Sequence, residues 1–352
     1  MKKVNVLRML ALLIIIALLA GCAQQAAAPE VTEAADTGPV KVDFRLNWTL
    51  YGEHAPFFLG VDKGFYSDEG LDVTILEGSG SATVVKLIGN GTNVIGYADS
   101  ATMMRSISAG VPVKAVAVTF QSSPMSFIQR ADHDLILDSI DKVPGSSIAI
   151  TAGDASLAIL DACLGKNNIS QDQINLVQVA NPAAKETSVL EGQTDTFLGY
   201  FVDQPLRMEK VTGVDMTWSK LVDVCGVNTL SSAIIVNNFY AEQNPDVVTK
   251  FVRASQRAWQ YTLEHPDEAA EIFAQHADAF DVPLSLSEIE GSLTLLHSPA
   301  TEGKPIGWSA PEDWTDTQNV LAEYAGFKPE EDINVFFNND FIAEPPYMPP
   351  GN

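Results

Sequence analysis

The chain is poor in positive charge and in cysteine. Its 352 residues include 21 Lys and Arg against 45 Asp and Glu, which gives a formal net charge of −24. Binding to nucleic acid through phosphates, or to an anionic membrane surface, requires a basic footprint, so this balance argues against both. Three cysteines are too few for a disulfide scaffold and too widely spaced for a zinc ribbon. We therefore expect no nucleic-acid partner.

Common catalytic motifs are also missing. The sequence has no His-Glu-x-x-His, no Gly-x-Ser-x-Gly and no phosphate-binding loop. Its five histidines are scattered, and no pair has the spacing of metal ligands. We predict no catalytic residue, no metal site and no cofactor.

What is present fits a globular protein of two parts. Apolar residues make up 46% of the chain and charged residues 19%, a composition that excludes a disordered chain or a coiled coil. At about 100–200 residues per domain, the length allows two domains or lobes with real cores.

The N-terminus has the composition of an export signal. Three basic residues precede a 12-residue apolar run at 9–20, which is shorter than the about 20 residues of a membrane-spanning helix. The run ends in LAGC at 19–22, which resembles a bacterial lipobox. We predict a lipoprotein signal peptide at 1–21 and lipidation of Cys22. The alternatives are an uncleaved anchor and an ordinary signal followed by a chance cysteine.

Residues 22–41 are rich in Ala, Gln, Glu, Thr and Pro and show no periodicity, which predicts a flexible stalk. A lipid anchor followed by a stalk predicts a protein held on the outer face of the cytoplasmic membrane, or in the periplasm. Such a stalk suits a protein that must reach a neighbouring membrane protein.

Strand-like and helix-like segments alternate from residue 40 onward. The expected strands are 40–46, 71–76, 94–98, 113–120, 125–130, 147–151, 174–179, 196–200 and 232–236, and the expected helices include 56–63, 82–88, 100–109, 155–164 and 183–190. This alternation predicts an α/β fold with largely parallel sheets. Because the pattern restarts after residue 130 and a helical tail follows residue 236, we predict one discontinuous lobe at 42–131 and 230–352 and a second lobe at 132–229.

Several stretches of this body resemble one family of binding proteins. They are LNWTLYGEHAPFF at 46–58, KGFY at 63–66, EGLDV at 69–73, GYFVDQP at 199–205 and the Asn-Pro and His-Pro helix starts at 244–245 and 265–266. They are similar to the ABC-transporter substrate-binding proteins for thiamine pyrimidine precursors, riboflavin, nitrate and sulfonates. The likeness covers roughly residues 41–345, and the Asn-Trp and His-Ala-Pro steps resemble most the pyrimidine-precursor branch.

This resemblance implies a bilobal periplasmic-binding-protein-like fold of type II, with a hinge and a ligand cleft between the lobes. It implies a monomer that closes on a small flat heterocycle, foremost an aminopyrimidine thiamine precursor. The ligand would pass to permease transmembrane subunits served by a cytoplasmic ATPase. Riboflavin, then a sulfonate or nitrate, are the rival ligands, and a membrane-tethered sensor or adhesion module is the alternative from another class.

One enzyme shares this fold branch, the fungal synthase that makes the pyrimidine from its own histidine. The resemblance implies for that chemistry a lysine and a histidine after the third strand, and a cysteine cluster before the return strand. The matching positions here read GYADSAT at 96–102 and CGVN at 225–228. Because these groups are missing, and no lysine or cysteine nucleophile is expected in the cleft, we predict that the protein is not an enzyme.

Ligands of α/β folds lie at the carboxyl ends of parallel strands, so we take residues that follow strands as candidates, beginning with the first lobe. Asn47, Trp48 and Tyr51 follow the first strand, and aromatic rings can stack on a flat heterocycle. Trp48 in the lobe core is the alternative. His54, at a helix start, either contacts the ligand or caps the helix, and Glu53 is interpreted as a solvated helix-start carboxylate.

Two further strand ends supply candidates, one of which has a purely structural alternative role. Tyr97 and Asp99 end the third strand, and Asp99 either caps the next helix or accepts a hydrogen bond from a ligand amine. Gly153 and Asp154 follow the strand 147–151, where free backbone amides can hold an anion.

The remaining candidates lie farther along the chain. Asn181 follows the strand 174–179. Tyr200, Phe201 and Asp203 follow the last strand of the second lobe, where two rings and a carboxylate suit stacking and an amine acceptor. Trp308, on a loop, either forms the cleft wall or packs on the surface.

Two compositional details complete these expectations. Only six arginines follow the signal, and none is placed convincingly at a strand end facing the cleft, although an oxyanion site favours several cationic donors. This favours a neutral or amine-bearing aromatic ligand over a small anion. Cys163 and Cys225 fall in the same lobe, and pairing and separate burial both remain open.

Overall fold

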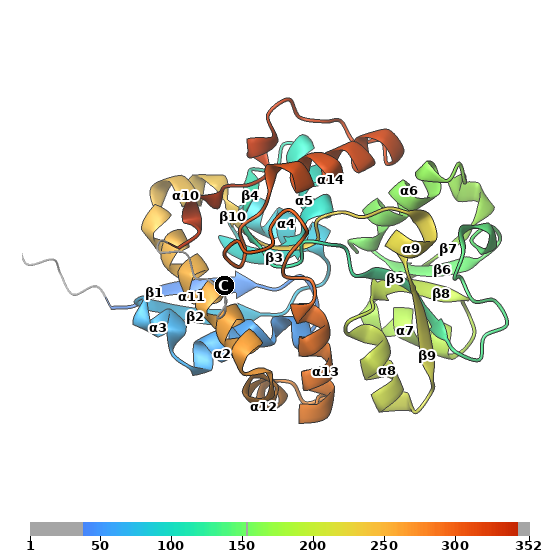
Figure 1. Cartoon of the computed structure of the whole chain (residues 1–352), viewed down its shortest axis with the longest axis horizontal. Coiled ribbons are helices and arrows are strands. Elements are labelled where there is room, and N and C mark those ends of the chain that lie inside the picture. Colours follow the sequence, from blue (N-terminus) through green and yellow to red (C-terminus); the bar gives the residue numbers. More distant parts are fainter. Residues whose placement is uncertain (1–37, 153, 344–352) are drawn as a thin grey trace, which may run out of the picture. The chain divides into compact units, whose positions relative to one another are not determined.

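The computed structural model describes residues 38–152 and 154–343 of the chain. From Pro39 onward the chain forms one compact unit, in which ten strands make two five-stranded sheets flanked by helices (Figure 1). The expected signal peptide, the lipidation site Cys22 and Gly153 lie outside the described residues, and so does the stalk apart from its last four residues.

The first sheet has the strand order β2-β1-β3-β10-β4. Its strands are β1 (Val40–Arg45), β2 (Leu71–Leu76), β3 (Ile95–Asp99), β4 (Val113–Val118) and β10 (Ser232–Asn237). Strands β1, β2 and β3 pair in parallel, whereas β10 runs antiparallel to both β3 and β4. All six residues of β10 are buried, as expected for a central strand that returns from the other sheet.

The second sheet repeats this plan with the order β7-β6-β8-β5-β9. Its strands are β5 (Met125–Arg130), β6 (Ser147–Thr151), β7 (Asn175–Val179), β8 (Thr196–Tyr200) and β9 (Met216–Lys220). Strand β6 pairs in parallel with β7 and β8, and β5 runs antiparallel between β8 and β9.

Helices cover both sheets (Figure 1). Beside the first sheet lie α2 (Ala55–Asp62), α3 (Phe65–Asp68), α4 (Ser81–Gly89) and α5 (Ser100–Ser108), and beside the second α6 (Ser156–Lys166), α7 (Pro182–Leu190), α8 (Gln204–Thr212) and α9 (Leu221–Cys225). The tail holds α10 (Asn238–Gln243), α11 (Pro245–Glu264), α12 (Pro266–His276), α13 (Val282–Leu293) and α14 (Pro311–Tyr324). Of these, α11 and α12 return to α2 beside the first sheet, whereas α14 packs mainly on α6 beside the second (Figure 1). Short 3₁₀ helices are η1 (Gly52–His54), η2 (Ile140–Lys142), η3 (Gln171–Gln173), η4 (Ile333–Val335) and η5 (Asn339–Phe341). Within residues 38–152 and 154–343, no helix is both long enough and apolar enough to cross a bilayer.

Helix α11 shows how the sequence pattern sets the packing. Proline at its first position cannot donate a backbone hydrogen bond and therefore suits a helix start. Val248, Phe251 and Trp259 recur at helical spacing and are buried. The Trp259 ring meets Phe57 of α2 edge-on, with ring centroids 6.0 Å apart. This apolar face of α11 therefore forms the contact with α2 beside the first sheet.

The chain passes between the sheets at 119–124 and again at 226–231. Strand β5, which the boundary predicted at 131–132 assigns to the first lobe, pairs with β8 and β9 of the second sheet. The two passages are hydrogen-bonded to each other, since Ser123 N–H donates to Asn228 Oδ1 at 3.0 Å. The division into hinged lobes stays a prediction.

The expectation of largely parallel sheets is also wrong. Four strand pairs are parallel and four are antiparallel. Strand–helix alternation predicts parallel neighbours only for strands that stay in one sheet, and β5 and β10 enter their sheets directly after a passage. The edge strand β9 was not predicted either, although Met216 and Trp218 alternate with Thr217 and Ser219 over four positions.

A disulfide closes part of the second-sheet region. Cys163 of α6 and Cys225 at the end of α9 are bonded, with their Cα atoms 5.2 Å apart. The bond resolves the alternatives that the sequence left open. It joins two helices separated by 62 positions in the sequence.

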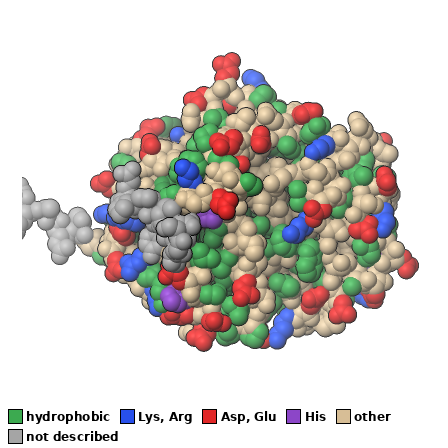
Figure 2. All heavy atoms as spheres, in the orientation of Figure 1, with side chains coloured by type: hydrophobic (Ala, Val, Ile, Leu, Met, Phe, Trp, Pro, Cys, Tyr) green, Lys and Arg blue, Asp and Glu red, His purple; other side chains and the backbone are tan. Residues whose placement is uncertain are grey.

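Surface charge follows the composition. In the face shown in Figure 2, Asp and Glu side chains are spread over the surface, and Lys and Arg side chains do not gather into one basic patch. This face therefore offers no footprint for a nucleic-acid backbone.

Candidate ligand-binding site

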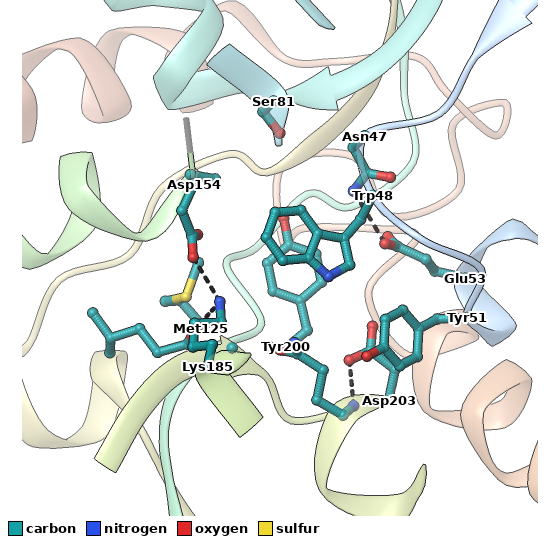
Figure 3. A pocket seen from close by; sticks show the side chains of 14 residues that line it. Asn47, Trp48, Tyr51, Glu53, Ser81, Met125, Asp154, Lys185, Tyr200 and Asp203 are labelled. Carbon is teal, nitrogen blue, oxygen red and sulfur yellow. Dashed lines mark hydrogen bonds and ion pairs between the residues drawn. The ribbon is translucent and has the colours of Figure 1, made fainter. Parts of the chain in front are cut away.

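A cavity lies between the two sheets, at the carboxyl ends of β1, β6 and β8 (Figure 3). The first-sheet side of the cavity is lined by Asn47, Trp48, Tyr51, Glu53 and Ser81. The second-sheet side is lined by Met125, Asp154, Ala155, Lys185, Leu198, Gly199, Tyr200, Asp203 and Gln204. This is the place where α/β folds bind small molecules, because strand-end loops and helix N-termini meet there.

Three aromatic side chains enclose the cavity: Trp48, Tyr51 and Tyr200. The Tyr51 hydroxyl donates to Glu186 Oε1 at 2.8 Å, and the Tyr200 hydroxyl lies 3.1 Å from Ser231 Oγ. The buried Nε1 of Trp48, in contrast, has no hydrogen-bond partner among the residues described. The cavity therefore offers ring faces for stacking and one uncommitted donor.

A buried ion pair occupies one side of the cavity. The Lys185 ammonium of α7 lies 2.6 Å from Asp154 Oδ2 and 3.0 Å from the Leu198 carbonyl oxygen, to which it donates. It also lies 4.9 Å from the centroid of the Trp48 ring. Because the Lys185 ammonium is paired with the Asp154 carboxylate, it contributes little net positive potential to the cavity. Its contact with the Trp48 ring helps to fix the position of the indole.

Glu53 lies on the opposite side of the cavity, as Figure 3 shows. Its Oε1 accepts from Asn47 Nδ2 at 3.1 Å, and Ser232 Oγ lies 3.5 Å from Oε2. Burial raises the pKa of the Glu53 carboxyl to about 7, although these two contacts favour the charged form. Glu53 therefore changes charge near neutral pH.

His54 supports this arrangement from behind. Its Nδ1 accepts from the Tyr51 N–H at 3.1 Å, so the proton resides on Nε2, which donates to Asn47 Oδ1 at 2.7 Å. Burial lowers the pKa of His54 to about 3, so its 3.3 Å contact with Glu53 joins a neutral ring to the carboxyl group and is no ion pair. His54 orients Asn47 and Tyr51 and does not line the cavity.

Asp203 and Glu288 extend the acidic side. Asp203 caps α8, and Glu288 of α13 accepts the Gly52 N–H at 2.7 Å through Oε2. Burial, followed by the charge of Glu53, raises the pKa of Asp203 well above its usual range, and burial followed by the charge of Asp203 does the same for Glu288. Three acidic groups therefore meet around Gly52.

A cluster of Tyr51, Glu186 and Arg207 connects the two sides at the mouth of the cavity. Arg207 of α8 forms an ion pair with Glu186 of α7, and its guanidinium lies 5.4 Å from the Tyr51 ring centroid. The same three residues line a second, outer hollow. Tyr51 follows β1, so its bond to Glu186 ties the first-sheet side to the second.

Six of the candidates predicted from the sequence line this cavity: Asn47, Trp48, Tyr51, Asp154, Tyr200 and Asp203. They come from both sheets, although positions 47 and 203 are far apart in the sequence. Trp48 is partly buried against the hydrophobic core, and its indole borders the cavity (Figure 3).

Other candidates lie elsewhere. Tyr97 is buried in the core, where its hydroxyl lies 2.6 Å from Thr119 Oγ1. Asp99 caps α5 by accepting the Thr102 N–H at 2.8 Å, which is the simpler of its two expected roles. Burial raises the pKa of Asp99 to about 6.

Three more candidates are outside the cavity lining. Asn181 is exposed and caps α7 through Ala184 N–H. Phe201 packs below the Lys220 ammonium, which lies 4.1 Å from its ring centroid. Trp308 packs near Lys304, away from the cavity, which agrees with surface packing.

Lys185 lines the cavity but was not among the predicted residues, and no lysine had been expected there as a nucleophile. The interpretation of Glu53 as a solvated carboxylate is wrong, because Glu53 is buried. A signal for Lys185 existed, since it shares one helix face with the buried Ser188 and Val189, three and four positions on. Glu53 gave no such signal, because α13 covers it from a distant part of the chain.

A comparison with solved structures identifies the fold. A Candida albicans protein described as having the generic periplasmic-binding-protein fold matches with a TM-score of 0.63 at 13% identity, over 86% of this chain and 97% of that chain. The two mixed sheets with a cavity between them are the type II periplasmic-binding-protein fold.

The sequence then identifies the family. The family model described as NMT1/THI5 like matches residues 52–269, so the chain belongs to the NMT1/THI5-like family.

Curated relatives carry names of two kinds. The riboflavin-binding protein RibY of Chloroflexus aurantiacus is 25% identical over 96% of this chain and 98% of its own length. The formylaminopyrimidine-binding protein of Halalkalibacterium halodurans is 24% identical over 89% and 92%. A 4-amino-5-hydroxymethyl-2-methylpyrimidine phosphate synthase of Legionella pneumophila is 23% identical over 87% and 94%. Binding proteins and synthases therefore occur among the relatives at similar identity.

Proposed function

We propose that this protein is the solute-binding component of an ABC importer and that it captures an aminopyrimidine thiamine precursor. The observation that carries the proposal is the cavity between the sheets, which combines the rings of Trp48, Tyr51 and Tyr200 with the carboxylates of Glu53 and Asp203. A flat ring buried between aromatic faces needs partners for its amino group, and the carboxylates supply acceptors.

The residues at the mouth suggest how capture works. Ligand that contacts both sides of the cavity favours the state in which they are close, and the Tyr51–Glu186 hydrogen bond joins the two sides in this structure. Closure then presents a surface that the permease subunits distinguish from the open form.

The rival ligands fit less well. A sulfonate or nitrate requires free cationic donors, whereas Lys185 is held by Asp154 and Arg207 by Glu186. Riboflavin would present a larger ring system and a neutral edge to the acidic side. The name of the relative RibY keeps riboflavin as the second candidate.

Synthase chemistry is the candidate from another class. Lys185 in the cavity is the observation in its favour, but this ammonium already bonds Asp154 and the Leu198 carbonyl. The residues at 96–102 and 225–228 lack the lysine, histidine and cysteine cluster that the resemblance implies for the synthase. We infer a binding protein and no enzyme.

Lipidation at Cys22 would tether this protein beside its permease outside the cytoplasm. We expect Cys22→Ser to release the protein from membranes, because the thiol that accepts the lipid is removed. Salt-washed membrane fractions measure this. A variant that still sediments with membranes contradicts the anchor.

Calorimetry tests the ligand. We expect heat and a raised melting temperature with 4-amino-5-hydroxymethyl-2-methylpyrimidine, since a ligand that binds only the folded state stabilises it by mass action. Riboflavin and an alkanesulfonate are titrated alongside. Tight sulfonate binding, with no heat from aminopyrimidines or flavins, would place this protein among anion-binding proteins.

A further inference from the structure

Buried carboxylates near the cavity differ in whether a cation accompanies them. Asp154 is paired with Lys185, and Glu186 with Arg207. Three others, which we call the carboxylate trio, form no ion pair with a Lys or Arg within the described part of the chain: Glu53, Asp203 and Glu288.

The trio meets from both sides of the cavity. Glu53 lies in η1 beside Gly52, whose N–H is bonded by Glu288 of α13, while Asp203 lies at the start of α8 on the second-sheet side. Glu53 and Asp203 line the cavity itself. Glu288 is fully buried, and its Oε1 has no hydrogen-bond partner among the residues described.

Arg207 is the cation whose charge reaches Asp203 and Glu288, but it is already paired with Glu186, and no cation acts on Glu53 among the described residues. The titratable and charged groups around the trio are His54, Tyr51, Tyr97, Tyr200, Asp99 and the two ion pairs Asp154–Lys185 and Glu186–Arg207. His54 is neutral, because burial holds its pKa at about 3, and burial raises the pKa of the three tyrosines, which stay neutral too. Asp99 adds only further negative charge.

A buried carboxylate without a cation is costly, so each member of the trio must either bind a proton or face a cation. The raised pKa values of Glu53, Asp203 and Glu288 express this need. The cavity gives a ligand direct access to Glu53 and Asp203, and the ligand is therefore the remaining source of positive charge.

We propose that the cavity binds its heterocycle as a cation, protonated on the ring and facing Glu53 and Asp203. This inference rests on the proposed function and specifies the charge of the ligand. A protonated aminopyrimidine presents two adjacent N–H donors, which match the two oxygens of a carboxylate as a bidentate pair. Glu288 adds negative potential from behind. Neutral flavins and anionic sulfonates lack this complementarity.

The pH dependence of binding tests the proposal. Above pH 7 the Glu53 carboxyl is ionised and a free aminopyrimidine is neutral, so forming the complex must take up a proton. We expect the Kd of 4-amino-5-hydroxymethyl-2-methylpyrimidine, measured by calorimetry with the full chain, to rise about tenfold per pH unit between 7.5 and 9. Titrations in two buffers of different ionisation enthalpy should show the uptake of about one proton.

Two further measurements locate the proton. In the complex, the ¹⁵N chemical shift of a labelled ring nitrogen should move to its protonated value. Glu53→Gln should weaken binding at least tenfold at pH 7.5 and flatten the pH profile. Glu268→Gln, whose parent residue pairs with Lys63 on the surface, is the matched control and should change neither.

The outcomes separate the two proposals. Binding with a flat pH profile and an unprotonated ring nitrogen overturns the cationic ligand and leaves the proposed function intact. Absence of aminopyrimidine binding at every pH from 6 to 9 contradicts both. The ring signal remains decisive even where Glu53→Gln fails to fold.

Discussion

The two sides of the cavity differ in whether their buried carboxylates are paired with a cation. On one side the Asp154 carboxylate is bonded to the Lys185 ammonium at 2.6 Å. The opposite, acidic side is formed by Glu53 from the first-sheet region and Asp203 from the second, and neither is ion-paired with a lysine or arginine among the described residues (Figure 3). The first side is complete before any ligand arrives, whereas the second is completed by a proton or by the ligand.

This difference separates residues that build the cavity from residues that select its occupant. A buried ion pair is hard to disturb, because removing one partner leaves the other charge buried alone. An unpaired carboxyl instead takes its charge state from pH and from what it faces. The paired side should therefore control stability, and the unpaired side should control affinity and pH dependence.

The largest effect is expected from breaking the paired side. Lys185→Met should lower the free energy of unfolding by about 3–5 kcal/mol, because Asp154 would remain buried without its partner. Urea denaturation at pH 7 measures the loss. Adding Asp154→Asn to this variant should recover part of it, since the uncompensated charge is then removed.

A surface pair provides the control for this prediction. Lys210 lies 2.6 Å from Asp281, but both side chains are about half exposed. Lys210→Met should cost less than about 1 kcal/mol, as exposed ion pairs do. If the two lysine variants lose equal free energy of unfolding, burial of the Lys185–Asp154 pair does not increase its contribution to stability.

The next effect concerns the unpaired side and its dependence on pH. The pKa of Glu53 is about 7 in the folded protein and near 4.3 in an unfolded chain, so the folded state binds the extra proton between these values. Its contribution to stability is present below pH 4.3 and is lost as pH rises through 7, by about 3 kcal/mol in all. Unliganded protein should therefore be less stable at pH 8 than at pH 5.5.

Glu53→Gln should reduce this slope, because glutamine does not titrate. Urea denaturation at four values of pH compares the variant with the unaltered protein and with Glu268→Gln. Identical slopes for all three would mean that Glu53 takes no part in the pH dependence of stability.

The sequence could predict the paired and unpaired sides only in part. Local patterns found most strands and the strand-end residues Asn47, Trp48, Tyr200 and Asp203, because the carboxyl end of a strand is a local property. They could not give the direction of β5 or β10, since each enters its sheet after a passage whose path depends on the whole fold.

Burial of charge was harder still to predict. Glu53 looks solvated in sequence, and it is buried only because α13, more than 200 residues later, covers η1 and places Glu288 on Gly52 N–H. Asp154 was predicted as a strand-end residue, but its partner Lys185 lies 31 positions on, in another helix. Long-range pairing of this kind leaves no local pattern.

A smaller effect is expected at Trp48, whose ring joins the two sides of the cavity. Trp48→Ala should weaken aminopyrimidine binding by about 1–3 kcal/mol, mostly through lost apolar burial and stacking. Calorimetry measures the change. Trp308→Ala is the matched control, because Trp308 is also half-buried but lies outside the cavity lining. If both variants bind equally weakly, the indole of Trp48 does not contact the ligand.

The smallest effect is expected at Tyr51, the link across the mouth. Tyr51→Phe removes the hydroxyl that donates to Glu186 Oε1 but leaves the ring in place. Glu186 keeps its ion pair with Arg207, so no charge is left alone, and the loss should be about 1 kcal/mol in the free energy of unfolding. Because this bond joins the two sides of the cavity, its loss should favour opening under the proposed closure, and ligand dissociation in stopped-flow should accelerate severalfold. A loss as large as that of Lys185→Met would instead mean that Glu186 depends on the hydroxyl, and that this carboxylate belongs with the unpaired group.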